Sequence, residues 1–468
     1  MSTPTYQLTK HPIGSLKEIW AVSWPLMLGL LSASLMYFSD RLILAHFSFL
    51  AMNAAANAGM ATWGALIFPL VIVEVTEVFV GRFNGEGKLA EVGRPVWQMI
   101  WLSIFTIPVY SIGSRIIAPI LFAGTGNTQF ESDYFITMCD FAPCFLTIIA
   151  LSGFFIGTGR MKVVTYTMII GNVLNILLDI PFIFGFGLIP SMGCKGAALA
   201  TGISQVVQVV ILFVLFLKEQ NRKTYGTHKI SFDKKLVTDC LKIAVPSGVG
   251  RFIEVLAHLT FFRIMIMAGP EAMTAATLVQ SLYLLIGFII DGLSKGATAV
   301  FSNLFGANQQ QLVRKVFRSS LLLHTILFVI FAATMLIFTE EVASCFFSDQ
   351  ERALLLRPDF LATIKKATFW MTIFFLFDGF CWIFFGLFTA AGDTKFIMYV
   401  NSTFNWVAYV LPVYIVVGIY NGSANHAWMI LAFYNMAAFG IYYFRYRQKI
   451  LKNLVPQLAP VQKAEPAL

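Results

Sequence analysis

The chain has 468 residues, of which 58% are hydrophobic and only 12% are charged, and its net charge is +9. Soluble domains carry about 25% charged and about 45–50% apolar residues, so the composition excludes a soluble enzyme, a disordered chain and a nucleic-acid-binding protein. It indicates an all-α polytopic membrane protein, whose excess of Lys and Arg is expected in the cytoplasmic loops.

Twelve segments are long and apolar enough to cross a bilayer, because a spanning helix needs about 20 mostly apolar residues. The polar stretch before the first segment, residues 1–18, does not have the pattern of a cleavable signal peptide. The predicted spans are residues 19–44, 50–80, 96–122, 133–157, 164–186, 196–217, 241–268, 273–304, 319–347, 361–390, 397–419 and 426–446.

The polar stretch at residues 218–240 divides these spans into two groups of six. When both termini are placed inside, 23 Lys and Arg fall in inner segments and six in outer segments, which predicts cytoplasmic termini. The expected organisation is a cytoplasmic segment at 1–18, an N-lobe at 19–217, a cytoplasmic linker at 218–240, a C-lobe at 241–446 and a cytoplasmic tail at 447–468.

The two halves align with each other when the chain is shifted along itself. A shift of 221 residues places Pro25 on Pro246 and Gly85 on Gly306, and a shift of 233 places Gly159 on Gly392 and Asn172 on Asn405. Six spans per half keep both halves in the same orientation, so we predict two pseudo-symmetric six-helix lobes. Transport sites commonly lie between such repeats.

A few acidic residues fall inside the predicted spans, where a charge costs at least about 2.5–3.5 kcal/mol. Asn175 and Asp179 are four residues apart, so they share one helix face just before Pro181. Carboxylate, amide and carbonyl oxygens are ligands for a small hard cation, and a carboxylate removed from water can instead carry a proton. The alternative is an aspartate that only hydrogen-bonds a neighbouring helix.

The second half of the chain also has acidic residues within predicted spans, which could either bind an ion or only pair with a neighbouring residue. Glu254 is flanked by Arg251 and His258 on one helix face, which fits either an internal Arg251–Glu254 pair or an ion-coupling group. His258 alone fits a hydrogen bond between helices better than a ligand. Asp378 has no cation within one helical turn and is the stronger functional candidate.

One further pair of charges lies in the eighth span. Asp291 and Lys295 are four residues apart, and we expect them to pair with each other. The 221-residue shift also relates Lys295 to Glu74, so a bond between the lobes is the alternative.

Catalytic and metal-binding patterns are missing from the sequence. There is no Walker loop, HExxH pair or GxSxG elbow in a suitable context, and the six cysteines form no CxxC pair. We therefore expect no enzyme, no catalytic residue, no cofactor and no metal site beyond a possible Na⁺.

Taken in order, four segments resemble the multidrug and toxin extrusion (MATE) transporters, and in particular their NorM-type branch. They are residues 24–46 with Pro25 and Asp40, the Ala-rich residues 54–58, residues 171–201 with Asn175, Asp179 and Pro181, and residues 386–395 with a Gly-Asp-Thr turn. The resemblance extends from about residue 16 to residue 445. It departs from the family at Arg41, Arg251 and Lys295, and at Phe374 where some NorM-type members have Tyr.

The resemblance implies a twelve-helix antiporter that exports organic, cationic or amphipathic compounds by alternating access in exchange for Na⁺ or H⁺. The implied ion-coupling residues are Asp40, Asn175 and Asp179 in the N-lobe, and Glu254 and Asp378 in the C-lobe. The candidate residues of the substrate cavity are Tyr37, Asn57, His258 and Phe374.

We expect a monomer in the bacterial inner membrane, with a small-molecule substrate, the lipid bilayer as its surroundings and no nucleic-acid partner. One alternative is a lipid-linked oligosaccharide flippase or metabolite carrier of the same architecture, which would need a cationic cavity built from Arg41, Arg251, Arg263 and Lys295. A non-transporting scaffold or receptor is the other alternative.

Overall fold

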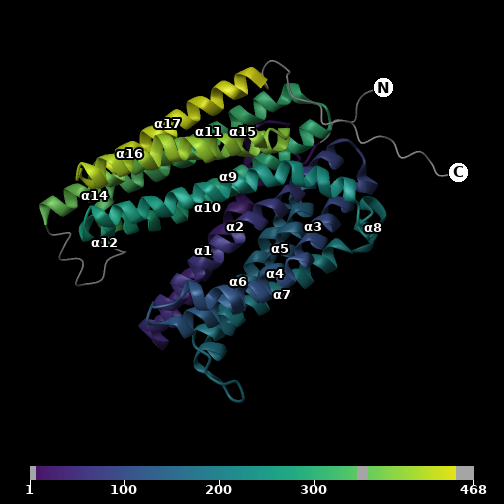
Figure 1. Ribbon diagram of the computed structural model, residues 1–468. Coiled ribbons are helices and arrows are strands. Elements are labelled where there is room, and N and C mark those ends of the chain that lie inside the picture. The colour runs from purple at the N-terminus through teal and green to yellow at the C-terminus, as the bar shows by residue number, and fades with distance from the viewer. Residues whose placement is uncertain (1–6, 345–356, 450–468) are drawn as a thin grey trace.

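The computed structural model describes residues 7–344 and 357–449, and all its regular structure in these ranges is helical. The first lobe holds six spans (Figure 1). They are α1 (Leu16–Phe47), α2 (Phe49–Gly85), the pair α3 (Gly93–Phe105) and α4 (Ile107–Leu121), α5 (Thr128–Gly157), α6 (Met161–Phe184) and α7 (Cys194–Phe216). The short helices η1 (Leu89–Glu91) and α8 (Glu219–Tyr225) flank them.

The second lobe holds six more spans. They are α9 (Lys234–Met267), α10 (Pro270–Gly306), α11 (Gln310–Ile337), α14 (Pro358–Ala391), a span built from α15 (Thr394–Tyr399), η2 (Val400–Phe404), η3 (Trp406–Val410), α16 (Leu411–Val413) and η4 (Tyr414–Ile419), and α17 (Ala424–Lys449). The short α12 (Thr339–Ser344) follows α11.

The twelve predicted spans are found as helices. Ten are both long and apolar enough to cross a membrane, and α9 and α10, with 34 and 37 residues, exceed the required length. Two predicted spans are not continuous α-helices: the third breaks at Thr106, next to Pro108, and the eleventh contains π-helical turns. The end of the ninth predicted span, residues 345–347, lies outside the described residues.

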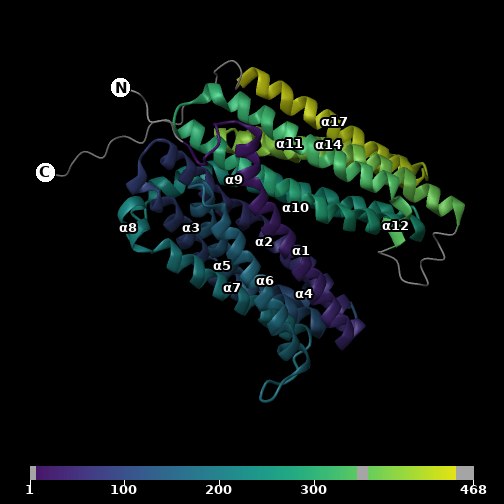
Figure 2. The same cartoon turned by 180° about the vertical axis from the view of Figure 1, so that it is seen from behind.

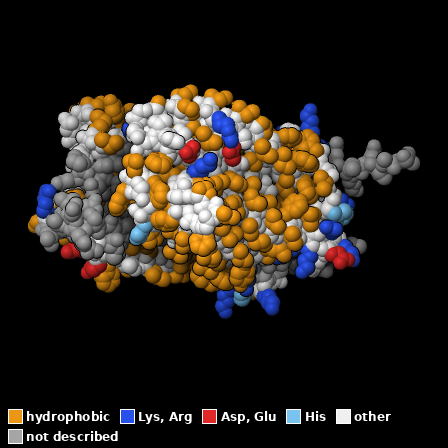
Figure 3. All heavy atoms as spheres, turned by 90° about the horizontal axis from the view of Figure 1, so that it is seen from below, with side chains coloured by type: hydrophobic (Ala, Val, Ile, Leu, Met, Phe, Trp, Pro, Cys, Tyr) orange, Lys and Arg blue, Asp and Glu red, His pale blue; other side chains and the backbone are white. Residues whose placement is uncertain are grey.

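Apolar side chains cover the outside of the bundle, as a bilayer requires. On α4, Ile120 and Val109 are 74% and 67% exposed. The face shown in Figure 3 is mostly hydrophobic, and its charged side chains are few and stand in small groups. Inside, large side chains such as Phe154, Phe216 and Phe384 are fully buried between helices. The exterior therefore faces lipid, and the chain is a multi-pass membrane protein.

A reciprocal contact between the lobes demonstrates their pseudo-symmetry. A Cβ atom on Gly85 would lie 2.0 Å from the carbonyl oxygen of Asn303, and one on Gly306 would lie 2.1 Å from that of Arg82. The 221-residue shift relates Gly85 to Gly306 and Arg82 to Asn303, so the two contacts are equivalent. Only glycine allows backbones to approach this closely, and the contact confirms the predicted duplication.

The lobes are joined at one end and diverge towards the other (Figures 1 and 2). Gly296 on α10 meets Ser23 on α1, and Gly248 on α9 meets Phe68 on α2. Beyond these contacts α1 and α10 separate, as both views show. The helix α8 and the last residues of α17 lie at the joined end, so the space between the lobes widens away from them.

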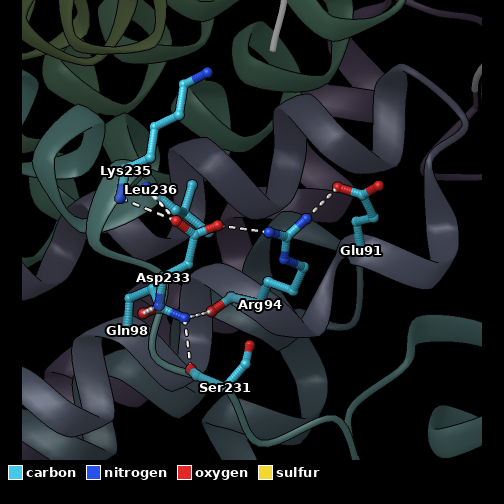
Figure 4. Close-up of polar contacts among 7 residues, drawn as sticks. All are labelled: Glu91, Arg94, Gln98, Ser231, Asp233, Lys235 and Leu236. Atoms are coloured by element: carbon cyan, nitrogen blue, oxygen red, sulfur yellow. Dashed lines mark hydrogen bonds and ion pairs between the residues drawn. The ribbon is translucent and has the colours of Figure 1, made fainter. Parts of the chain in front are cut away.

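Arg94, at the start of α3, fixes the linker to the first lobe (Figure 4). Its guanidinium bridges Glu91, at 2.8 Å, and Asp233, at 2.5 Å. Gln98 holds the same segment, because its amide nitrogen donates to the Ser231 carbonyl at 2.9 Å and its oxygen accepts from the Asp233 backbone N–H at 2.8 Å. Residues 231–233 of the linker are therefore held against the first lobe, and we call them the docked strap.

Asp233 also begins the first helix of the second lobe. Its Oδ1 accepts hydrogen bonds from the backbone N–H groups of Lys235 and Leu236, at 2.9 and 3.1 Å (Figure 4). A side chain that satisfies free N–H groups at a helix start is an N-cap. One aspartate therefore caps α9 and ties that end of the helix to α3.

Candidate functional site

The first lobe brings two aspartates together in its interior. Asp40 lies on α1 and Asp179 on α6, and they are 8% and 0% exposed. Their carboxyl groups face each other closely enough to interact directly. Among the described residues, neither oxygen of Asp179 receives a hydrogen bond from an N–H or O–H group. Two carboxylates cannot donate to each other, so this contact calls for a proton or another cation between them.

Asn175 completes this carboxyl pair one helical turn before Asp179. With its amide nitrogen turned towards the pair, it donates to Oδ1 of Asp40 at 2.9 Å, and its oxygen accepts from the backbone N–H and the hydroxyl of Thr201, each at 3.2 Å. Asn175 is fully buried. Thr201, on α7, thus orients the amide that faces Asp40, so three helices of one lobe contribute to the site.

Two amides near this site hold polar groups of other helices. The amide of Asn172 donates to the Ser32 hydroxyl at 2.7 Å. The amide of Asn57, a predicted cavity residue on α2, donates to the buried carboxylate of Glu131 at 2.6 Å. Glu131 lies on α5 and also contacts the Thr125 hydroxyl. Glu131 precedes the predicted span at residues 133–157, so its sequence position did not mark it as a charge within the membrane.

The predicted cavity residues lie in different surroundings. Tyr37 on α1 is 48% exposed, whereas Phe374 on α14 is 3% exposed and packs in the apolar core of the second lobe. His258 on α9 places its ring Nδ1 2.9 Å from the carbonyl oxygen of Glu254. Its ring also lies 5.7 Å from that of Tyr409.

The second lobe surrounds its glutamate with donors. Arg251 binds Oε1 of Glu254 at 2.8 Å from the preceding helical turn. The amide of Asn401, on η2, donates to Oε2 at 2.9 Å. The Tyr442 hydroxyl, on α17, donates to the oxygen of that amide at 2.7 Å. Both carboxylate oxygens of Glu254 are therefore engaged, and the predicted internal pair is present.

Asp378 lies close to this group. The amide of Asn435, on α17, donates to its Oδ1 at 3.3 Å, and its carboxyl group is near enough to Glu254 and Arg251 to interact with their charges. The supporting Asn401 and Asn435 were missed in the sequence. A single amide in an apolar span was the available signal, but unlike Asn175 neither amide lies one helical turn from an acidic residue of its own span.

A third group of charges joins the lobes. Lys295 on α10 binds Glu74 on α2 at 2.9 Å and Asp291 at 3.7 Å. The expectation that Lys295 pairs chiefly with Asp291 is therefore corrected, because the shorter bond crosses between the lobes. Glu77, one turn from Glu74, interacts electrostatically with the same lysine.

The four cations inside the spans have different surroundings. Arg251 and Lys295 are paired with carboxylates, while Arg41 and Arg263 are exposed on α1 and α9. In residues 7–344 and 357–449, no three His, Cys, Asp or Glu side chains converge as metal ligands. The arrangement fits a proton or a monovalent cation held between two carboxyl groups, one of which also accepts a hydrogen bond from an amide.

The sequence of this chain matches a family model and is similar to known members of that family. The family model MatE matches residues 25–181 and 246–415. A relative from Thermotoga maritima, described as a probable multidrug resistance protein NorM, is 25% identical over 346 residues, which cover 72% of this chain and 73% of the relative.

Solved structures share the fold over nearly the whole chain. A structure described as the outward-facing conformation of a multidrug resistance MATE family transporter has a TM-score of 0.84 at 19% identity, covering 96% of this chain and 99% of the other. A MOP superfamily transporter from Pyrococcus furiosus, whose binding pocket is described as having reverse polarity, has a TM-score of 0.84 at 18% identity, with coverages of 95% and 99%.

Proposed function

Because the chain belongs to the MatE family of multidrug efflux transporters, we propose that it exports organic cationic or amphipathic compounds in exchange for Na⁺ or H⁺. Members of this family are transporters and not enzymes. The T. maritima relative is described as a multidrug resistance protein, which supports small organic molecules as the substrate class.

The observation that carries the coupling proposal is the state of Asp179. It is fully buried, faces the carboxyl group of Asp40, and has no other donor among the described residues. A carboxylate left in this state is costly unless a cation neutralises it. We therefore assign the exchangeable ion to Asp40 and Asp179, with Asn175 as a hydrogen-bond donor to Asp40.

Coupling requires that the ion and the substrate favour different arrangements of the lobes. We place both termini in the cytoplasm, so the space that widens away from α8 opens to the outside. Ion entry from outside would neutralise the carboxyl pair and permit α1 and α6 to repack. The lobes would then close around a site that has released its substrate and reopen inwards to collect another.

The test is Asp179→Asn in proteoliposomes loaded with ethidium. Asparagine has nearly the same size but cannot carry the charge that holds the ion, so we expect ion-driven efflux to fall at least about tenfold. Asp140→Asn is the matched control, because Asp140 pairs with Arg115 at the surface. Undiminished efflux by Asp179→Asn, with normal folding, would reject the assignment.

The flippase alternative has less support. An anionic headgroup would need several free cations in one place, whereas Arg251 and Lys295 are bound to carboxylates, and Arg41 and Arg263 belong to different lobes. The cation exporter is therefore the function that we propose.

A further inference from the structure

The acidic residues of the two lobes have opposite surroundings. In the first lobe, the buried Asp179 faces a second carboxyl group. In the second lobe, Glu254 receives a guanidinium on one oxygen and an amide on the other. The repeat does not relate the two sites, since the 221-residue shift places Glu254 on Ala33 and Asp40 on Phe261. They can therefore differ in function.

Arg251 is held in place from two sides. Its guanidinium lies 2.8 Å from Glu254 on its own helix and 4.1 Å from the ring centroid of Trp382 on α14. The side chains of Arg251 and Glu254 are only 23% and 19% exposed. A cation stacked on tryptophan and bonded to a carboxylate in partly dry surroundings is bound by two attractive interactions.

The carboxylate of Glu254, the partner of Arg251, is also fixed in position. Asn401 holds Oε2 of Glu254, and Tyr442 holds Asn401, so α9, η2 and α17 all fix its position. A sodium ion approaching Glu254 would meet the positive charge of the guanidinium and would have to share oxygens that already accept hydrogen bonds from Arg251 and Asn401. The guanidinium is part of the chain, so its effective concentration at the carboxylate far exceeds that of a dissolved ion.

We propose that Arg251 is a built-in counter-ion that takes the place of a free cation at Glu254, and thereby confines ion exchange to the first lobe. Arg251 would thus determine which lobe responds to the ion. The inference rests on the proposed cation-coupled export and specifies where the coupling occurs.

Removing the tethered charge tests this directly. In Arg251→Met, Glu254 loses its cation, and we expect ²²Na⁺ bound to the purified full chain to rise by about one ion per protein. Arg251→Lys is the matched control, because lysine keeps the charge and should show no such gain. An Arg251→Met protein that binds no additional ²²Na⁺ would overturn the proposal.

If the single variant folds poorly, the double variant Arg251→Met/Glu254→Gln still tests the proposal, because it removes the charge of Glu254 together with that of its partner Arg251. We expect its ethidium efflux to keep the wild-type dependence on Na⁺ and pH gradients, imposed separately. Loss of that dependence would refute the role of Arg251. If Asp179→Asn kept the wild-type dependence of efflux on the ion gradients, the proposed first-lobe site would be refuted instead. Failure of the Arg251 proposal and failure of the first-lobe proposal therefore give different results.

Discussion

At the scale of single residues, the surroundings of a carboxylate determine what it can bind. Asp179 and Glu254 both stand within apolar spans, yet Asp179 meets another acid while Glu254 meets Arg251 and Asn401. A carboxylate with both oxygens engaged is structural unless its partners move. A buried acid pair needs a cation or a proton, and we propose that this occupancy changes during transport.

A substitution at Asn175 tests the first-lobe site without changing the charge of that site. Asn175→Ala removes the amide that donates to Asp40 and stabilises its empty, charged form, so we expect the ion concentration for half-maximal efflux to fall by about 10- to 100-fold, as for a lost hydrogen bond to a charged group. Proteoliposome efflux at graded ion concentrations measures this.

Thr201→Val provides a matched comparison, because it removes only the hydroxyl that orients Asn175. A smaller shift in the same direction is expected, since the backbone N–H of Thr201 still binds the amide. An Asn175→Ala protein with an unchanged ion dependence would exclude the amide from the site.

At the scale of helices, the ends of α9 are fixed differently. Asp233 caps its start and ties it to α3, whereas its far end is free to diverge from the first lobe (Figures 1 and 4). Under the proposed alternating access, we expect rotation of the second lobe to pivot near the docked strap. The π-helical turns of η2 present Asn401 to Glu254, which links this irregular span to the site in the second lobe.

Asp233→Ala removes both the cap of α9 and the bridge to Arg94. We expect a loss of stability of about 1–2 kcal/mol, the usual contribution of an N-cap, seen as a lower unfolding temperature by tryptophan fluorescence. Asp239→Ala is the control, since Asp239 pairs only with the exposed Lys242 in the described contacts. Equal melting temperatures for the two variants would show that the strap does not stabilise the molecule.

At the scale of the whole molecule, the repeat itself creates the contact between the lobes. Glu74 and Lys295 are equivalent under the 221-residue shift and bind each other, which places their bond on the pseudo-twofold axis. Each lies 11 residues before the end of its helix, Gly85 or Gly306. At 1.5 Å per residue this is about 16 Å from the joined end, near the middle of a bilayer.

Lys295→Met should favour separation of the lobes, because it removes this bond and leaves Glu74 and Asp291 to repel each other. Spin labels at residues 42 and 259, in a cysteine-free background, report the separation of the two lobes. We expect the distribution of distances between them, measured by electron paramagnetic resonance, to shift or broaden. Lys366→Gln, at an exposed position on α14, is the control. Superimposable distance distributions would show that the bond does not hold the lobes together.

Hydropathy alone predicted the twelve spans and their division into two groups of six, because a bilayer imposes the same length and apolarity on every span. The residue matches under the 221-residue shift predicted the duplication. Hydropathy also marked Asp40, Asp179, Glu254 and Asp378, since charges in hydrocarbon are rare. Only the tertiary structure decided their partners. Asn435 and Tyr442 are neutral and leave no such signal, and whether Lys295 meets Asp291 or Glu74 depends on how two distant helices are rotated against each other.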